Sequence, residues 1–351
     1  RGHCNNLMQE YFTCNFFDSK YADFLGCWSL SQRQLVPVNT NALSPKTINY
    51  ACVWLGTDDL SGKPVAIIPI RDNSELLQYT LNNFKKNNFF DRVHVIIVDD
   101  RSTENLKKIC KKQKVNYLRV DNEVGFNFSM LNNIPAFIAS NLGATQIILW
   151  NSDLWIDNIE SFDKFLALHN EEQSTISGSK LLYPIESMHP DDSVNIKTHF
   201  PDKLGGSYRG TVQFGGSRWM RRSMKTANGN VDMMLPYHFL RFASPDEPRV
   251  NSNYATEFVT GALQLIDLDW FIGVGGLNPS LAKVFQDVDL CLRAVQDNKK
   301  VMYLGKDIQF FHDESYNHYS NRDEKKMDLQ FSSDHGLFTK IWKDKIFKIF
   351  L

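Results

Sequence analysis

The sequence lacks several features that would each assign it to a particular class of protein. Its 39 Lys and Arg are balanced by 40 Asp and Glu, so the formal net charge of −1 gives no electrostatic reason to expect a nucleic-acid partner. No run approaches the ~18 consecutive apolar residues of a membrane span, and the first residues show no signal-peptide pattern. We therefore expect a cytoplasmic protein with no transmembrane segment and no nucleic-acid partner.

Cysteine is sparse, and its spacing forms no metal-binding motif. Four of the six cysteines fall within the first 52 residues, and none belongs to a CxxC pair. A disulfide or zinc site near the N-terminus and free thiols in a reducing cytoplasm are both compatible with this pattern, and we favour free thiols. The chain starts with Arg1 rather than Met, so we expect a processed form or a piece of something longer.

Apolar runs of strand length alternate with segments of helical periodicity through the first half of the chain. The runs predict strands at 65–70, 93–98, 115–120 and 146–150, and the periodicity predicts helices at 74–86, 106–112, 128–141 and 159–169. Because such alternation requires crossover connections, it predicts an α/β fold with a mainly parallel sheet flanked by helices. Ligands of such sheets bind at the carboxyl ends of the strands.

The same pattern divides the chain into three parts. Residues 1–62 show no sustained period and are predicted to be an N-terminal extension, and residues 63–318 form the main domain. Within that domain, Gly, Pro, Asn and Asp accumulate over 184–253, and apolar strand patterns return from residue 258. Residues 319–351 are predicted to be a charged C-terminal helical tail.

Polar turns that carry carboxylates close two of the predicted strands. Asp99 and Asp100 follow the strand at 93–98, where a carboxylate can bind a nucleobase or a ribose hydroxyl. Asn151 and Asp153 follow the strand at 146–150 and, being two residues apart, can face one ligand, such as a hard divalent cation. Helix capping at the first turn and an Asx turn at the second are the structural alternatives.

Two further residues are candidates for chemistry in the C-terminal half. Asp287 stands at a predicted helix start, where it could take a proton from an acceptor hydroxyl as a general base. Asp289, two residues on, is better suited to capping that helix or holding a neighbouring loop. His312 closes an apolar strand and can be a metal ligand, although a lone His can equally be a hydrogen-bonded structural residue.

Taken in order, these motifs resemble those of the family 2 glycosyltransferases, in particular the bacterial rhamnosyltransferase-like branch with the GT-A fold. The resemblance extends from about residue 65 to 318 and rests on an ordered set of matches. They are VDDRST at 98–103, FNFS at 126–129 with Asn132-Asn133, Asn151-Ser152-Asp153, Gly261-Ala262 with GGL at 275–277, QDVDLCLR at 286–293, and His312.

The resemblance implies an inverting, metal-dependent hexosyl- or deoxyhexosyltransferase with a GT-A fold, acting in cell-surface polysaccharide or glycan assembly. Its partners would be a UDP- or dTDP-linked nucleotide-sugar donor and a carbohydrate acceptor, and a lipid-linked acceptor could bring the protein to a membrane surface. The resemblance also implies roles for individual residues: nucleotide binding by Pro69, Arg71, Asp99, Asp100 and Ser152, binding of Mn²⁺ or Mg²⁺ by Asp153 and His312, and general-base catalysis by Asp287.

Other interpretations stay open at this point. Several residues of the 184–253 region could bind the acceptor or could pack a variable loop: Trp219, Arg221, Arg222, Tyr237 and His238. Gln286 stands where the family has Glu, and Asn151 is a neutral residue, so the chain could instead be a catalytically inactive sugar- or nucleotide-binding module of a larger polysaccharide-assembly protein. A nucleotidyltransferase would need a Gly-rich basic loop after the first strand, and residues 69–73 supply one Arg and no Gly.

Overall fold

The structure is a computed structural model that describes most of the chain. The described residues are 8–17, 26–29, 34–37, 47–122, 125–185, 208–226, 229–313 and 324–349. Among them, none of the helices combines the length and the apolarity that crossing a bilayer needs. The cysteines whose side chains are described are all buried: Cys52, Cys110 and Cys291. The remaining cysteine side chains lie outside the described residues: Cys4, Cys14 and Cys27.

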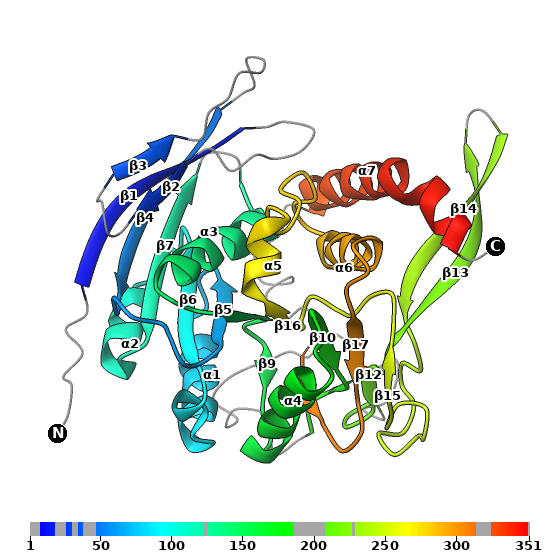
Figure 1. Cartoon of the computed structure of the whole chain (residues 1–351), viewed down its shortest axis with the longest axis horizontal. Coiled ribbons are helices and arrows are strands. Elements are labelled where there is room, and N and C mark those ends of the chain that lie inside the picture. Colours follow the sequence, from blue (N-terminus) through cyan, green and yellow to red (C-terminus); the bar gives the residue numbers. More distant parts are fainter. Residues whose placement is uncertain are drawn as a thin grey trace.

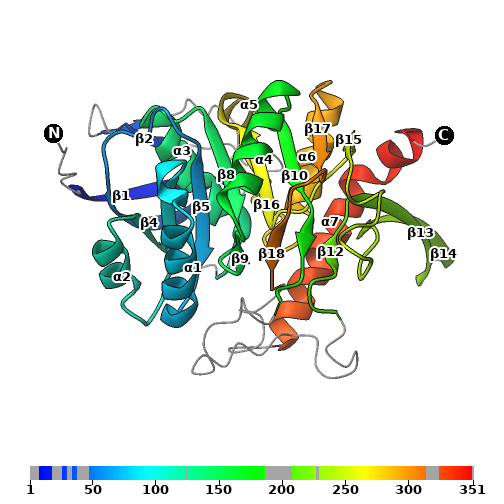
Figure 2. The same cartoon turned by 90° about the horizontal axis from the view of Figure 1, so that it is seen from below.

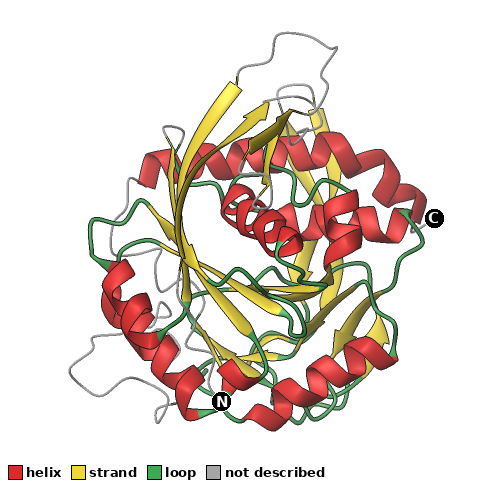
Figure 3. Cartoon of the chain, turned by 60° about the vertical axis from the view of Figure 1, so that its left-hand side comes forward, coloured by secondary structure: helices red, strands yellow, loops and turns green. Residues whose placement is uncertain are grey.

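A ten-stranded sheet runs through the molecule (Figure 1). Its strands, in spatial order, are β1 (Met8–Phe17), β4 (Thr47–Gly56), β7 (Asn116–Asn122), β6 (His94–Asp100), β5 (Val65–Ile70), β8 (Gln146–Trp150), β16 (Leu263–Asp267), β10 (Ile176–Ser179), β17 (Val301–Leu304) and β15 (Asn253–Ala255). Helices cover both faces of the sheet (Figure 3). They are α1 (Ser74–Lys86), α2 (Leu106–Gln113), α3 (Phe128–Asn141), α4 (Ile159–Glu171), α5 (Leu268–Gly273), α6 (Gln286–Gln296) and α7 (Glu324–Ile349), with a 3-10 turn, η1 (Phe89–Asp91). The expected α/β fold is confirmed.

The centre of the sheet is parallel and its flanks are mixed. Strands β7, β6, β5 and β8 run in one direction, whereas β16 runs against β8 and begins opposite the last residue of that strand, with Leu263 paired to Trp150. The carboxyl ends of the central strands and the start of β16 therefore lie at one edge of the sheet. The core strands are almost completely buried, as the apolar runs at 65–70 and 146–150 predicted.

The N-terminal part of the chain differs from the prediction. Residues 1–62 were expected to be an irregular extension, but β1 and β4 form an antiparallel pair and β4 also pairs with β7 along the edge of the main sheet. A separate hairpin, β2 (Gly26–Ser29) with β3 (Gln34–Pro37), lies in the same region. Aromatic and polar residues are mixed in β1 and β4 without a regular period. Their strand conformation therefore depends on the pairing of β4 with β7 and of β1 with β4, which the sequence pattern does not show.

Two smaller strand groups complete the fold. A four-stranded sheet is formed by β12 (Val212–Phe214), β11 (Leu181–Leu182), β18 (Phe310–His312) and β9 (Leu154–Trp155). A long hairpin is formed by β13 (Ser217–Thr226) and β14 (Gly229–His238), and Figure 2 shows it projecting from the body beside α7. The small sheet brings segments from 154 to 312 together, and thereby positions His312 next to the end of β8.

Helix α7 is fastened to the loop that precedes α6. The buried carboxylate of Asp334 accepts hydrogen bonds from the backbone N–H groups of Lys283 and Val284, at 2.7 and 3.0 Å. The buried Trp342 donates its indole N–H to Asp289 of α6 at 2.8 Å. What the sequence predicted as a tail thus packs directly against the start of α6.

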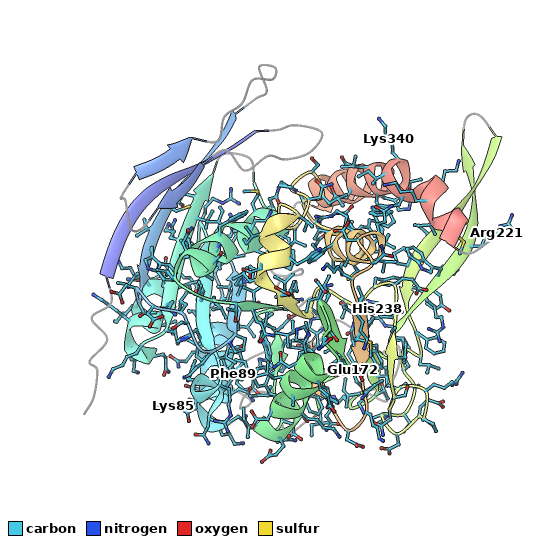
Figure 4. All side chains as sticks on the ribbon, in the orientation of Figure 1. Lys85, Phe89, Glu172, Arg221, His238 and Lys340 are labelled. Atoms are coloured by element: carbon cyan, nitrogen blue, oxygen red, sulfur yellow. The ribbon has the colours of Figure 1, made fainter. Side chains whose placement is uncertain are left out.

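We expect Asp334→Ala to lower the free energy of unfolding by about 1–3 kcal/mol, because two partly buried N–H donors lose their buried acceptor. The measurement is chemical denaturation. Lys340→Ala on the same helix is the control, since this exposed side chain points away from the body (Figure 4) and its removal should change stability by about 0.5 kcal/mol or less. Equal stability of the two variants would contradict the anchoring role of Asp334.

Candidate functional site

The loops that follow β5 and β6 form one hydrogen-bonded unit. Asp72 accepts hydrogen bonds from the backbone N–H of Thr103 at 2.7 Å and from its hydroxyl at 2.9 Å. The hydroxyl of Ser102 accepts one from the N–H of Asp72 at 2.7 Å. Glu104 accepts two more from Asn73 and Ser74 at the start of α1. These contacts hold the ends of two neighbouring parallel strands in a fixed relation.

Asp99 is a structural member of this unit. One carboxylate oxygen accepts the N–H of Ser102 at 2.7 Å, and the other accepts the Tyr117 hydroxyl at 2.5 Å and the Arg119 guanidinium at 3.1 Å. Its side chain is inaccessible to solvent. Since both oxygens already have protein partners, the geometry favours a role in shaping the loop over a direct contact with a ligand.

Asp100 is placed differently. Its carboxylate is paired with the guanidinium of the adjacent Arg101, at 2.8 and 3.2 Å. Burial raises the pKa of the Asp100 carboxyl, and Arg101 offsets part of that rise. Asp99 is opposite Ile70 in the parallel register, so Asp100 lies level with Arg71, whose side chain is about half exposed. An accessible cation and a carboxylate are therefore adjacent at the edge of the sheet, and Pro69 lies on β5 two residues before Arg71.

Asn151, Asp153 and His312 meet beyond the end of β8. The Nε2 atom of His312 lies 3.4 Å from a carboxylate oxygen of Asp153 and 3.2 Å from the side-chain nitrogen of Asn151. The side chains of Asp153 and His312 are only 8% and 5% exposed, so neither group is on open surface. The carbonyl of the intervening Ser152 accepts a hydrogen bond from Thr80 of α1 at 2.8 Å, which fixes the turn.

These three side chains offer carboxylate, amide and imidazole atoms to one point, as the spacing of Asn151 and Asp153 predicted. Within the described ranges there is no cluster of three or more His, Cys, Asp or Glu side chains suited to a metal ion. The set therefore supplies two ionisable groups and one amide. A cation held there would need its remaining ligands from a bound substrate or from water.

Asp287 is held at the start of α6 by backbone donors. One carboxylate oxygen accepts the N–H of Gly261 at 2.7 Å, and the other accepts the N–H of Val288 at 2.9 Å. Burial raises the pKa of this carboxyl, and these hydrogen bonds reduce the rise. A Cβ atom at position 261 would lie 3.0 Å from that of Asp287, so a larger residue there would require a shift of a few tenths of an ångström.

A short hydrogen-bonded path connects the last two groups. The N–H of Asn151 donates to the carbonyl of Ala262 at 3.1 Å, and the preceding Gly261 donates to Asp287. The start of β16 thus joins the turn that carries Asp153 to the helix that carries Asp287. Residues from three distant parts of the sequence come together at one edge of the sheet.

The polar residues of the 126–133 motif hold the loop that leads to Asp287. Asn127 donates to the carbonyl of Pro279, the Ser129 hydroxyl donates to that of Leu281, and the side chain of Asn133 bonds both backbone groups of Leu277. These contacts explain why this motif and the 275–277 glycine segment occur together. They have a positioning role that the sequence alone did not reveal.

A pocket of about 850 Å³ opens beside Asp287. It lies between the β13–β14 hairpin, the start of α6 and α7, and most of its wall is aromatic or apolar. Its lining residues are Phe214, Met220, Leu235, Pro236, Tyr237, His238, Phe258, Thr260, Lys283, Val284, Phe285, Gln286, Asp287, Val288 and His335. Among the predicted site residues, Asp100, Asp153 and Trp219 do not line it.

Of the predicted acceptor residues, Tyr237 and His238 line this pocket and Trp219 does not. Trp219 packs its ring edge-on against Phe258, with the ring centroids 5.0 Å apart, behind the pocket wall. Arg222 belongs to β13, and its side chain lies outside the described residues. The neighbouring Tyr237 and Met220, by contrast, line the pocket and are 39% and 42% exposed.

The comparison with protein families identifies the central part of the chain. Residues 65–224 match the model described as "Glycosyl transferase family 2". A curated relative, the "Uncharacterized protein y4gI" of Sinorhizobium fredii (strain NBRC 101917 / NGR234), is 26% identical over 264 residues. The match includes 72% of this chain but 24% of that protein, so the chain spans about a quarter of its relative's length.

Several solved structures have a partly similar arrangement, and three of them are compared with this chain by identity and coverage. GalNAc-T7 with UDP, GalNAc and Mn²⁺ has a TM-score of 0.46 and 13% identity, over 74% of this chain and 45% of that one. The mannosyltransferase PcManGT of Pyrobaculum calidifontis, with GDP-Man and Mn²⁺, has a TM-score of 0.43 and 11% identity, over 76% of this chain and 62% of that one. TarS (1–349) of S. aureus has a TM-score of 0.43 and 14% identity, over 81% of this chain and 74% of that one.

Proposed function

We propose that this chain transfers a glycosyl group from a nucleotide-diphosphate sugar to an acceptor hydroxyl, with inversion at the anomeric carbon. The family match over residues 65–224 supports glycosyl transfer. The observation that carries the proposal is the placement of Asp287 in a pocket wall and, through Gly261, Ala262 and Asn151, beside the Asp153–His312 pair. This arrangement supports a site that combines a proposed base with the polar cluster.

The donor nucleotide would bind over the ends of β6 and β5. Asp100 is proposed to accept hydrogen bonds from the base or the ribose, and Arg71 is the nearby cation suited to a phosphate. Adjacent strands lie about 4.8 Å apart, so two strand spacings between β6 and β8 give roughly 10 Å. That span fits a nucleoside diphosphate lying between Asp100 and Asp153, with Pro69 and Ser152 beside it. A UDP- or dTDP-linked sugar remains the proposed donor.

The cluster of Asn151, Asp153 and His312 fits Mn²⁺ or Mg²⁺. Carboxylate and amide oxygens and one imidazole nitrogen are ligands these ions accept, and a site with few protein ligands suits an ion that also binds substrate phosphates. When bound there, the ion would neutralise the negative charge of the departing diphosphate. Asp153 and His312 are the side chains proposed to hold it, and Asn151 would present its oxygen.

Asp287 is proposed as the general base. It would take the proton of the acceptor hydroxyl while that oxygen forms a bond to the anomeric carbon. The bond from that carbon to the phosphate oxygen breaks, and the nucleoside diphosphate leaves with the electron pair. A carboxyl whose pKa is raised is a stronger base than an exposed one. A single displacement of this kind inverts the configuration and needs no covalent intermediate with the protein.

The acceptor is proposed to occupy the pocket beside Asp287. Tyr237, His238 and His335 offer rings on which a sugar can pack, together with polar atoms for its hydroxyls. This placement moves the proposed acceptor site from Trp219 to the pocket-facing residues of the same hairpin. The acceptor would be a carbohydrate, and lipid-linked glycans remain within this proposal.

The wider role is also a proposal. We infer that residues 63–318 form the transferase domain, with α7 as a C-terminal addition and β1–β4 as an N-terminal one. Activity in cell-surface polysaccharide or glycan assembly, a bacterial rhamnosyltransferase-like specificity and a cytoplasmic location at or near a membrane surface follow from the family resemblance. The curated relative is about four times longer than the matched part, so further domains could share the task.

We expect Asp153→Ala to weaken Mn²⁺ binding at least about tenfold, since loss of even an outer-sphere partner costs about 10–100-fold. The measurement is calorimetric titration of MnCl₂ in the presence of UDP. Asp157→Ala is the matched control, because this carboxylate is exposed and lies four residues away. Equal Mn²⁺ affinities in the two variants would refute the cation site.

We expect Asp287→Asn to lower turnover by about 10²-fold or more while donor binding changes little, because only proton removal is lost. Release of UDP or dTDP from nucleotide sugars in Mn²⁺ gives the turnover, and calorimetry gives donor affinity. Asp58→Asn, at an exposed carboxylate before β5, serves as the control. If the unaltered protein binds nucleotide sugars but releases no diphosphate, the chain is a binding module instead.

We expect Tyr237→Ala to raise the KM for an aryl glycoside acceptor about 2–10-fold, since one aromatic packing contact contributes ~0.5–1.5 kcal/mol. Donor hydrolysis should stay unchanged in the same variant. Phe242→Ala removes an exposed aromatic outside the pocket and should leave KM unaltered. A similar KM for all three proteins would place the acceptor elsewhere.

A further inference from the structure

Cations are concentrated in two segments of the chain that fold next to each other. Residues 217–238, which include both strands of the β13–β14 hairpin, contain four Lys or Arg and one Asp, and residues 340–348 of α7 contain four Lys and one Asp. The two segments together have a net charge of +6, so the remainder of the chain, whose total is −1, carries −7. Strand β14 packs against α7, and the hairpin and this helix lie side by side in Figures 1 and 2.

The cations of these two segments face solvent. Those whose side chains are described are all exposed: Arg218, Arg221, Lys340, Lys343 and Lys345. Arg221 and Lys340 both point away from the body in Figure 4. Among the described residues, lysine forms ion pairs at Lys164 and Lys300, so no described carboxylate neutralises Lys340 or Lys343. Their charge is therefore available to a partner.

Exposed apolar side chains lie among these cations. Met220 and Tyr237 are 42% and 39% exposed, and both belong to the hairpin. Large apolar residues with this exposure are few in the described part of the chain, and the others are Phe126, Ile185 and Phe242. A surface that combines cations with protruding apolar side chains is typical of proteins that lie against lipid headgroups.

We propose that the basic surface, formed by residues 217–238 and 340–348, binds the headgroups of a lipid bilayer that contains anionic lipid. Charge complementarity supports this partner, because an anionic bilayer offers negative charge to many separate cations at once, and each one adds to the affinity. Met220 and Tyr237 would contact the boundary between headgroups and acyl chains. A soluble polyanion would use the cations but would give no reason for these two exposed side chains.

The basic surface adjoins the pocket beside Asp287, since Met220 and Tyr237 also line that pocket. A bilayer bound there would bring membrane-anchored acceptors to the pocket directly. This consequence rests on the proposed function and selects acceptors anchored in a membrane as the substrate class. The binding of the bilayer itself rests on the charge and the exposure of the two segments alone.

The experiment is co-sedimentation of the whole chain with vesicles, in the absence of nucleotide sugar and acceptor. We expect binding to vesicles of mixed phosphatidylglycerol and phosphatidylcholine and much weaker binding to pure phosphatidylcholine. Raising NaCl to about 1 M, where the Debye length is about 3 Å, should release most of the bound protein. Equal affinities for the two kinds of vesicle would overturn the proposal. Because no transfer is measured, an inactive protein that still binds would refute the proposed function and leave this result standing.

A pair of double variants tests the position of the surface. Lys340→Gln with Lys343→Gln should weaken binding to the anionic vesicles roughly 20-fold, because each cation near an anionic leaflet contributes a factor of about five. Lys85→Gln with Lys86→Gln is the matched control, since it removes the same charge from two exposed lysines of α1, far from α7 in Figure 4. If both double variants bind equally, the surface is placed wrongly.

A third variant separates a bilayer from a soluble polyanion. Met220→Ser should weaken binding to the anionic vesicles about threefold or more, because an apolar contact is lost. Its binding to heparin, which offers anions but no apolar phase, should not change. A protein that binds heparin as tightly as the vesicles, and whose vesicle binding Met220→Ser does not alter, would have a site for soluble polyanions, and the assignment to a membrane would be wrong.

Discussion

The contact between Asp287 and the backbone N–H of Gly261 is the constraint on which the site depends. It fastens the start of α6 to the start of β16, and β16 is hydrogen-bonded to β8, the strand that ends beside Asp153. The approach is close, since a Cβ atom at position 261 would lie 3.0 Å from that of Asp287 and would require a shift of a few tenths of an ångström. The Asp287 carboxylate, the turn that carries Asp153 and the edge of the sheet are thereby connected through hydrogen bonds.

Hydrogen bonds from neighbouring segments hold the elements on both sides of this contact. Asp334 of α7 holds the loop before Asp287, and Trp342 and Arg293 both bond the carboxylate of Asp289 on α6. The carboxylate at 287 and the one at 289 thus have separate tasks: one lines a pocket, and the other binds the C-terminal helix. On the opposite side, the polar side chains at 127–133 fix the loop over 277–281.

Much of the fold could be predicted because its central elements carry strong local patterns. The strand at 65–70 and the helices at 74–86 and 128–141 have the predicted bounds, since continuous apolar runs and helical spacing leave few alternatives. Strands β1 and β4 and the β13–β14 hairpin were missed. Their residues, such as Arg218–Arg222 and Gln9–Thr13, have no regular alternation, and only pairing with a neighbour makes them strands.

The sequence by itself determined the α/β core and the residues Asp100, Asp153, Asp287 and His312 as candidates, because motif spacing is a local property. Only the tertiary structure decided that both oxygens of Asp99 are occupied by hydrogen bonds within the protein. It also decided which of the acceptor candidates on the hairpin line the pocket, since Tyr237 does and Trp219 does not. Finally, it decided that the buried side chain of Gln213, on β12, lies 3.4 Å from the ring of His312, although the two residues are 99 positions apart in the chain. A buried amide has no sequence signature, since its role comes from the groups that folding brings to its two ends.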